Sequence, residues 1–186
     1  GGSSNAATTL AGLATLWDIN DSAPLHTVAR ELGSDVPVCL PPHRAVHMGG
    51  IGDIITPLKA PLPHLHLLLV NPNIPCPTPA VYRALRMTNY SAAIDVPALP
   101  SRQDLIDFLK EKTRNDMTEA AISIVPSIAD VLSALHGVNG CLIARMSGSG
   151  TTCFGVFADK ETANTAALHL QTQHPAWWVV ATETID

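Results

Sequence analysis

The sequence has few aromatic side chains, few charged side chains and no excess of positive charge. Aromatic residues make up 4% of its 186 residues and charged residues 15%, and the formal net charge is −5. Nucleic-acid-binding proteins usually carry a basic stripe, and none is visible here, so we expect no nucleic-acid partner. A polyanion would have to bind in a local pocket of backbone N–H groups. The 46% share of hydrophobic residues predicts a globular protein with an ample aliphatic core.

Three other kinds of signal are also missing from the sequence. The longest apolar run, near residues 65–70, is far shorter than the roughly 20 residues of a membrane span, so we expect no membrane partner. The eight histidines form no HExxH motif or paired cluster, and no metal site is predicted. No CxxC motif is present, and we expect buried free thiols and a cytoplasmic location. The four cysteines are Cys39, Cys76, Cys141 and Cys153.

The first third of the chain predicts two helices followed by a hairpin. The apolar spacing of residues 3–17 and 22–32 predicts helices, with Ser22 as the N-cap and Gly33 as the stop of the second. Residues 36–40 form a short apolar run that predicts a strand, and residues 45–48 its return strand. The proline-rich stretch at 59–65 reads as a linker. We therefore expect a first domain over residues 1–59 and a second over 60–186.

The second region alternates strands and helices in a recognisable order. Strands are expected at 64–71, 141–146, 153–157 and 177–182, and helices near 77–85, 101–112, 118–136 and 160–173. Thr78 is the expected N-cap of the first of these helices, Ser101 caps the second, and Pro126 should kink or split the third. The order strand, helices, strand, strand, helix, strand predicts a ferredoxin-like α+β sandwich with an antiparallel sheet.

Three loops of small residues could carry chemistry. Gly1, Gly2, Ser3 and Ser4 precede a helix and could hold a phosphate, although Gly-Ser runs also occur as linkers. The loop "MSGSGTT" at 146–152 could be a second anion-contacting turn or merely a permissive hairpin loop. It is not the nucleophile elbow of a serine hydrolase, because the position two before Ser149 is not glycine and a strand follows. Asp35 in "LGSDVPV" is either an ordinary turn residue or a carboxylate positioned to accept a hydroxyl proton.

Six motifs taken in order closely resemble one enzyme family. They are "GGSSNAA", "LGSDVPV", "GGIGDIITPL", "VNPNIPCPTPAVY", "RND" and "ARMSGSGTTCFGVFAD". The family is the 4-diphosphocytidyl-2-C-methylerythritol kinases of the GHMP kinase superfamily, and the resemblance extends from residue 1 to about 159. It implies an α+β two-lobe GHMP-kinase fold, with an incomplete N-terminal ATP lobe at 1–59 and a ferredoxin-like C-terminal lobe at 60–186.

The resemblance also implies site residues and substrates. ATP with Mg²⁺ would be the phosphoryl donor, and a cytidine diphosphate conjugate the acceptor, in the non-mevalonate route to isoprenoids. Asp35 matches the catalytic aspartate that accepts the proton of the tertiary hydroxyl. Thr78 falls in the substrate-side turn and Tyr82 where the family stacks an aromatic ring on cytosine. Asn5 departs from the aspartate of many members. ATP would be held by Gly1, Gly2, Ser3, Ser4, Gly148, Ser149 and Gly150.

An alternative follows from where the resemblance begins. Family members have roughly a further third of chain before this point, including the first strands of the ATP lobe and a lysine that assists phosphoryl transfer. We therefore expect either a working kinase or an inactive folded fragment of one. In the second case a separate N-terminal segment of the same protein, or a second copy of the chain, is the expected partner.

Overall fold

The computed structural model describes residues 2–40, 45–50, 52, 54–58, 60–85 and 94–184. These residues divide into two compact units, one up to Leu62 and one from Pro63. We describe each unit by itself. The expected domain boundary after residue 59 remains a prediction.

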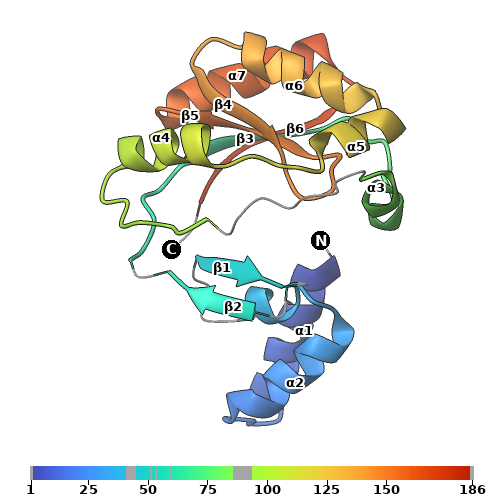
Figure 1. The fold of residues 1–186 in the computed structure, drawn as a ribbon, viewed down its shortest axis with the longest axis vertical. Helices are drawn as coiled ribbons and strands as arrows, with labels where there is room; N and C mark the ends of the chain where they lie inside the picture. The colour runs from blue at the N-terminus through green and yellow to red at the C-terminus, as the bar shows by residue number, and fades with distance from the viewer. Residues whose placement is uncertain are drawn as a thin grey trace. The chain divides into compact units, whose positions relative to one another are not determined.

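The first unit contains two helices, a short 3₁₀ helix and a two-stranded hairpin (Figure 1). Helix α1 spans Gly2–Leu16 and α2 spans Ser22–Leu32, as the apolar spacing predicted. Asp21, rather than the expected Ser22, caps α2, because its carboxylate accepts a hydrogen bond of 2.9 Å from the Ala23 N–H. The core is small and consists of Ala7, Ala29, Val36 and Leu40.

The predicted strand at 36–40 is wrong. Residues Pro37–Cys39 form the 3₁₀ helix η1, and the Val36 carbonyl accepts a hydrogen bond from the Cys39 N–H. Proline fixes φ near the helical value and lacks an N–H for a sheet, which favours this outcome over a strand. Strand β1, Val46–Gly49, is present as expected, but it pairs antiparallel with β2, Ile54–Pro57.

The second unit is built on a four-stranded antiparallel sheet in the order β4-β5-β3-β6. The strands are β3 (His66–Asn71), β4 (Cys141–Met146), β5 (Cys153–Phe157) and β6 (Trp178–Glu183). Leu68 of β3 lies between Gly155 of β5 and Ala181 of β6, so β3 is a central strand. This order and direction confirm the ferredoxin-like topology predicted from the alternation of strands and helices.

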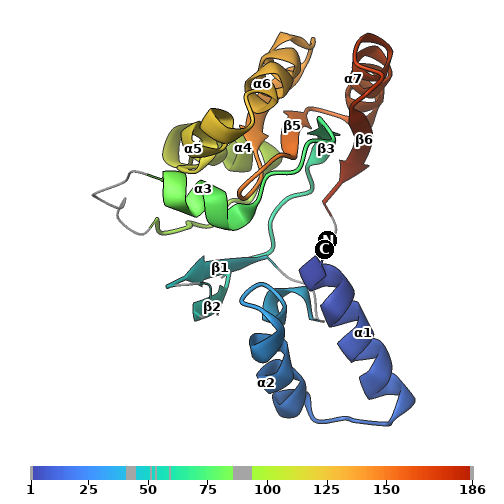
Figure 2. The same cartoon turned by 90° about the vertical axis from the view of Figure 1, so that its right-hand side faces the viewer.

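Helices cover one face of this sheet (Figure 2). Helix α6 (Ser127–Gly137) packs on β4 and β5, and α7 (Lys160–Gln173) packs on β6 and β3. Pro126 separates α6 from α5 (Thr118–Ile124), which confirms the predicted split. The core between helices and sheet is formed by large apolar side chains with little or no exposure, including Leu68, Val70, Ile128, Leu135, Phe157 and Leu170.

Two further helices flank the sheet. Helix α4, Arg102–Lys112, begins with a capping box between Ser101 and Asp104, which confirms Ser101 as its N-cap. Helix α4 is bonded to β4, because the Arg145 guanidinium donates a 2.8 Å hydrogen bond to the Leu109 carbonyl. Partial burial lowers the pKa of Arg145. Helix α3 spans Thr78–Ala84, but Pro77 and not Thr78 occupies its N-cap position. The expected cap by the Thr78 hydroxyl is therefore wrong.

Candidate functional site

The loop between β4 and β5, residues 147–152, is the most strongly held of the small-residue loops. The Ser147 N–H donates to the Thr152 carbonyl at 2.9 Å, and the Gly150 N–H donates to the Ser147 carbonyl at 3.0 Å. Gly148 and Gly150 have φ values of +54° and +85°, which L residues with side chains rarely adopt. The loop is therefore a tight, glycine-dependent turn between two paired strands.

The first residue of α3 meets this loop directly. The hydroxyls of Thr78 and Ser149 share a hydrogen bond of 2.8 Å, although 71 positions separate them in the sequence. Tyr82 lies one turn further along α3, on the same helix face as Thr78, and 58% of it is exposed. Thr78 and Ser149, predicted from two different motifs, are thus brought together in the second unit, and Tyr82 lies one turn along α3 from Thr78.

Two asparagines that were not among the predicted site residues hold the loop. The Asn115 side-chain amide donates to the carbonyls of Met146 and Gly148, at 2.8 Å each. The Asn71 amide donates to the Thr152 hydroxyl at 2.8 Å, and its oxygen accepts from the Thr151 hydroxyl at 3.2 Å. Both asparagines fall in motifs that signalled the family resemblance, "RND" and "VNP", but nothing local in those motifs indicates a role at this loop.

Thr151 anchors the base of the loop in the core. It is 5% exposed and is the one buried polar side chain among the described residues. Its hydroxyl lies 3.0 Å from the Ile74 carbonyl as well as close to the Asn71 amide oxygen. A buried hydroxyl with hydrogen-bond partners avoids the cost of an unsatisfied polar group, so this contact fixes the loop to the segment after β3.

In the first unit, Asp35 lies in the turn between α2 and η1. Its side chain is exposed, and the Ser34 hydroxyl lies 3.4 Å from its Oδ1 atom. The neighbouring Val36 is 2% exposed and anchors the turn in the small core. The turn therefore presents a solvent-accessible carboxylate from a fixed backbone position.

The glycine-serine stretch at the start of the chain becomes the first turn of α1. Gly2 opens the helix, Ser3 is half-buried and Ser4 is exposed, while Gly1 lies outside the described residues. The first N–H groups of a helix have no partner within the helix, and its dipole favours an anion there. No acidic residue occupies the first turn of α1 to oppose that preference.

Residues 96–176 match the family described as GHMP kinases C terminal. A solved structure, the crystal structure of 4-(cytidine 5′-diphospho)-2C-methyl-D-erythritol kinase, is 30% identical, superposes with a TM-score of 0.74, and matches 97% of this chain and 64% of its own. Over nearly all of its length, this chain is therefore similar in sequence and fold to a GHMP-type kinase. The match extends beyond residues 96–176, because the superposition includes nearly all of the chain.

Curated relatives are more similar to this chain in sequence than the solved structure is. A 4-diphosphocytidyl-2-C-methyl-D-erythritol kinase of Rhodospirillum rubrum is 49% identical over 97% of this chain and 59% of its own length. One from Cereibacter sphaeroides, strain KD131, is 48% identical over 96% of this chain and 63% of its own length. The chain thus spans about 60% of the length of these relatives.

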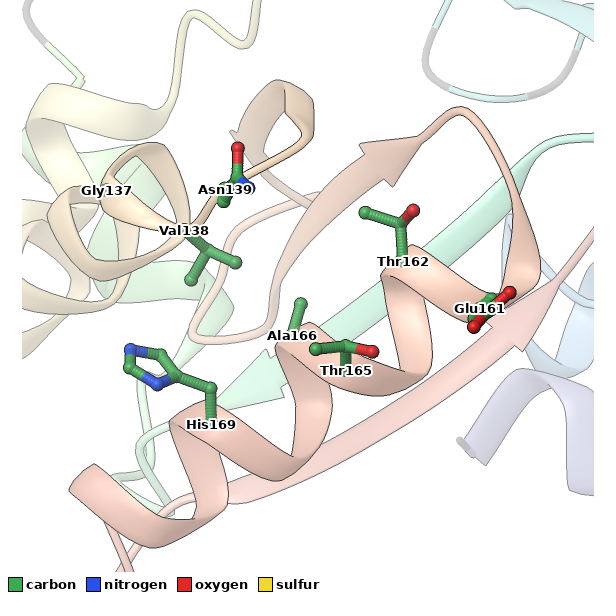
Figure 3. Close-up of a pocket in the computed structure, with 8 residues that line it drawn as sticks. All are labelled: Gly137, Val138, Asn139, Glu161, Thr162, Thr165, Ala166 and His169. Carbon is green, nitrogen blue, oxygen red and sulfur yellow. The ribbon is translucent and has the colours of Figure 1, made fainter.

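The second unit has a cavity away from the loop at 147–152. It measures about 580 Å³ and lies between the end of α6 and α7 (Figure 3). Its walls come from the segments before β4 and after β5, so it is at the opposite end of that strand pair from the loop. It contains none of the predicted site residues. Its lining is Gly137, Val138, Asn139, Glu161, Thr162, Thr165, Ala166 and His169.

In the parts of the chain that the structure describes, the histidines and carboxylates do not gather around a common point. Among the described residues, no group of three or more His, Cys, Asp or Glu side chains is placed to hold a metal ion. His64 Nδ1 lies 2.8 Å from the Thr184 carbonyl, and His66 Nδ1 lies 3.7 Å from a carboxylate oxygen of Glu183. In the part of the chain that the structure describes, no helix has both the length and the apolar character needed to cross a bilayer.

Proposed function

We propose that this protein transfers the γ-phosphoryl group of ATP to the tertiary hydroxyl of 4-diphosphocytidyl-2-C-methyl-D-erythritol. The reaction would be a step of non-mevalonate isoprenoid precursor synthesis in the cytoplasm. The observation that carries the proposal is the hydrogen bond between Thr78 and Ser149, which come from two separate motifs that the family resemblance assigned to the substrate-side turn and to phosphate binding. Tyr82, assigned to the cytosine, lies one turn along α3 from Thr78. The names and the 48–49% identity of the relatives support the same substrate.

The second unit would contact both the phosphates of ATP and the cytosine of the acceptor substrate. Gly148, Ser149 and Gly150 would face the phosphates with backbone N–H groups and one hydroxyl. The exposed ring of Tyr82 would stack on the cytosine, since a flat aromatic side chain suits a base. Thr78, hydrogen-bonded to Ser149 at 2.8 Å, would then lie between these two contacts. Such positioning is most of what phosphoryl transfer requires of a protein.

The first unit would supply a second phosphate contact and the base. Residues 1–4 would hold ATP phosphates at the start of α1, where partial positive charge favours an anion. The Asp35 carboxylate would accept the proton of the tertiary hydroxyl as its oxygen bonds to the γ-phosphorus and the bond to ADP breaks. Mg²⁺ would arrive bound to the phosphates of ATP.

The assignment of lobes and partners is also part of the proposal. Residues 1–59 would be the remainder of an ATP-binding lobe and residues 60–186 the C-terminal lobe. In the first unit, the adjoining residues Leu16 and Trp17 are 74% and 63% exposed, and contiguous exposed apolar side chains can mark a surface that binds another polypeptide. This exposure supports a further polypeptide partner there, either a separate segment of the same protein or a second copy of the chain.

The direct test is a kinase assay on the full-length protein with ATP and 4-diphosphocytidyl-2-C-methyl-D-erythritol, measuring ADP. Asp35→Asn should lower kcat at least 100-fold, the usual contribution of a general base. Glu31→Gln removes an exposed carboxylate at the end of α2 in the same unit, and it should leave the rate within 2-fold. Full activity in Asp35→Asn would exclude the assigned role.

The same assay decides the alternative, that this chain alone is an inactive folded fragment. The 186-residue chain is assayed beside the full-length protein at equal concentration. ADP formation by the full-length protein only would support the fragment hypothesis. ADP formation by both would exclude it. Formation by neither would exclude the proposed function.

A further inference from the structure

The side-chain amide of Asn115 forms hydrogen bonds with two different segments of the chain. The oxygen Oδ1 accepts a 2.9 Å hydrogen bond from the Met117 N–H, just before α5 begins at Thr118. The nitrogen Nδ2 uses both of its hydrogens on the loop, donating to the carbonyls of Met146 and Gly148 at 2.8 Å each. The oxygen therefore supports the start of a helix, and the nitrogen supports the loop at 147–152.

The contact with the Gly148 carbonyl also sets the direction of the next N–H. In a planar trans peptide the C=O and the following N–H point in opposite directions. With the Gly148 carbonyl directed at Asn115, the Ser149 N–H must point away from Asn115. In the part of the chain that the structure describes, the N–H groups of Gly148 and Ser149 have no acceptor. Successive free N–H groups in a tight turn form a concave anion-binding surface.

We propose that Asn115 is a positioning residue, whose amide nitrogen holds the 147–152 loop so that the Ser149 N–H is presented to a phosphate of ATP. The inference rests on the proposed function and adds to it a residue that touches neither substrate. The half-buried location of Asn115 supports this role, because its donors are partly shielded from competing water. The loop has few other means of fixing that peptide, since its own two backbone bonds involve Ser147, Gly150 and Thr152.

Because the oxygen and the nitrogen of the Asn115 amide bond to different segments, substitutions can remove the two contacts separately. Asn115→Asp keeps an oxygen for the Met117 N–H, and a carboxylate is also favourable at the start of a helix. It loses both donors and places an acceptor against two carbonyl oxygens. Asn115→Ala loses both functions. Asn139→Asp is the matched control, because it makes the same change at an exposed asparagine before β4, at the other end of the strand from the loop.

The first measurement is amide hydrogen exchange on this chain, read by NMR, and it does not depend on activity. In Asn115→Asp the Gly150 N–H should exchange at least 10-fold faster, because its bond to the Ser147 carbonyl loses its support. The Ala121 N–H, which bonds to the Met117 carbonyl in α5, should keep its rate. In Asn139→Asp neither rate should change. An unchanged Gly150 rate in Asn115→Asp overturns the inference.

The second measurement is steady-state kinetics on the full-length protein. Loss of two hydrogen bonds should raise KM for ATP about 10-fold or more in both Asn115→Asp and Asn115→Ala. KM for the cytidine substrate should stay within 2-fold, and Asn139→Asp should match the wild type. A rise in the Asp variant alone would indicate charge repulsion and would overturn the inference, as would a loss of kcat without a change in KM. If the wild-type protein makes no ADP, the proposed function fails, and hydrogen exchange still decides whether Asn115 holds the loop.

Discussion

Replacing Gly150 by alanine should destabilise the second unit by about 3 kcal/mol. The position has a φ of +85°, and left-handed backbone costs a residue with a Cβ atom about 1–2 kcal/mol. The new Cβ would lie 2.9 Å from Met146 Sδ and 3.3 Å from Ile128 Cδ1. Met146 is 2% exposed and Ile128 fully buried, so neither can move into solvent. Overpacking of this kind costs a further ~1–3 kcal/mol.

Urea unfolding measures this cost, with Gly148→Ala as the matched control. At Gly148, φ is +54° and no atom lies within 4 Å of the added Cβ, so only the backbone cost of about 1 kcal/mol is expected. A Trp17→Phe background leaves Trp177 and Trp178, both in the second unit, as the fluorescent reporters. Equal losses in the two alanine variants would refute the packing argument, since they would leave no contribution from the buried neighbours.

Three other predictions concern the second unit. Ser101→Ala removes the N-cap of α4 and should lower the free energy of unfolding of the second unit by about 1 kcal/mol, measured by the same urea titration. Hydrogen bonds from the Thr162 backbone and side chain lower the pKa of Asp159 at the start of α7, so its contribution to stability is complete above about pH 4 and is lost as the pH falls through the lowered pKa. Asp159→Asn should remove this part of the acid sensitivity of unfolding, and an unchanged profile would contradict the assignment. Burial raises the pKa of the Cys153 thiol to about 12, so iodoacetamide at pH 8 should alkylate the half-buried Cys76 in the folded protein while Cys153 reacts only after unfolding, as mass spectrometry would reveal.

Local signals in the sequence predicted much of the second unit correctly. Pro126 cannot continue a helix, and the structure ends α5 before it and begins α6 after it. Ser101 and Asp104 satisfy each other's backbone N–H groups at the start of α4, an arrangement that needs residues only three positions apart. Where one short stretch contains all the interacting groups, the sequence alone is sufficient to predict where a helix begins or ends.

One wrong prediction misread a local signal, and the other errors involve interactions that a short stretch does not contain. Periodicity cannot distinguish a strand from other buried structure in an apolar run as short as 36–40, and there the Pro37 ring favours a helical turn. Thr78 was expected to cap its own helix, but its hydroxyl bonds instead to Ser149, far along the chain. Asn71 and Asn115 escaped notice for the same reason, because their partners lie on the β4–β5 loop.

These distant partners have a consequence for the order of folding. The bonds that fix the loop join Asn71 to Thr152 across 81 positions and Asn115 to Gly148 across 33. Contacts between residues so far apart form only after the chain entropy of the intervening segments has been lost. The β4–β5 hairpin can therefore form early from local pairing, while its loop reaches the native shape only once β3 and the start of α5 have docked. Newly made chains would thus acquire the proposed phosphate-binding surface at the last stage of folding, so incompletely folded molecules should not present it.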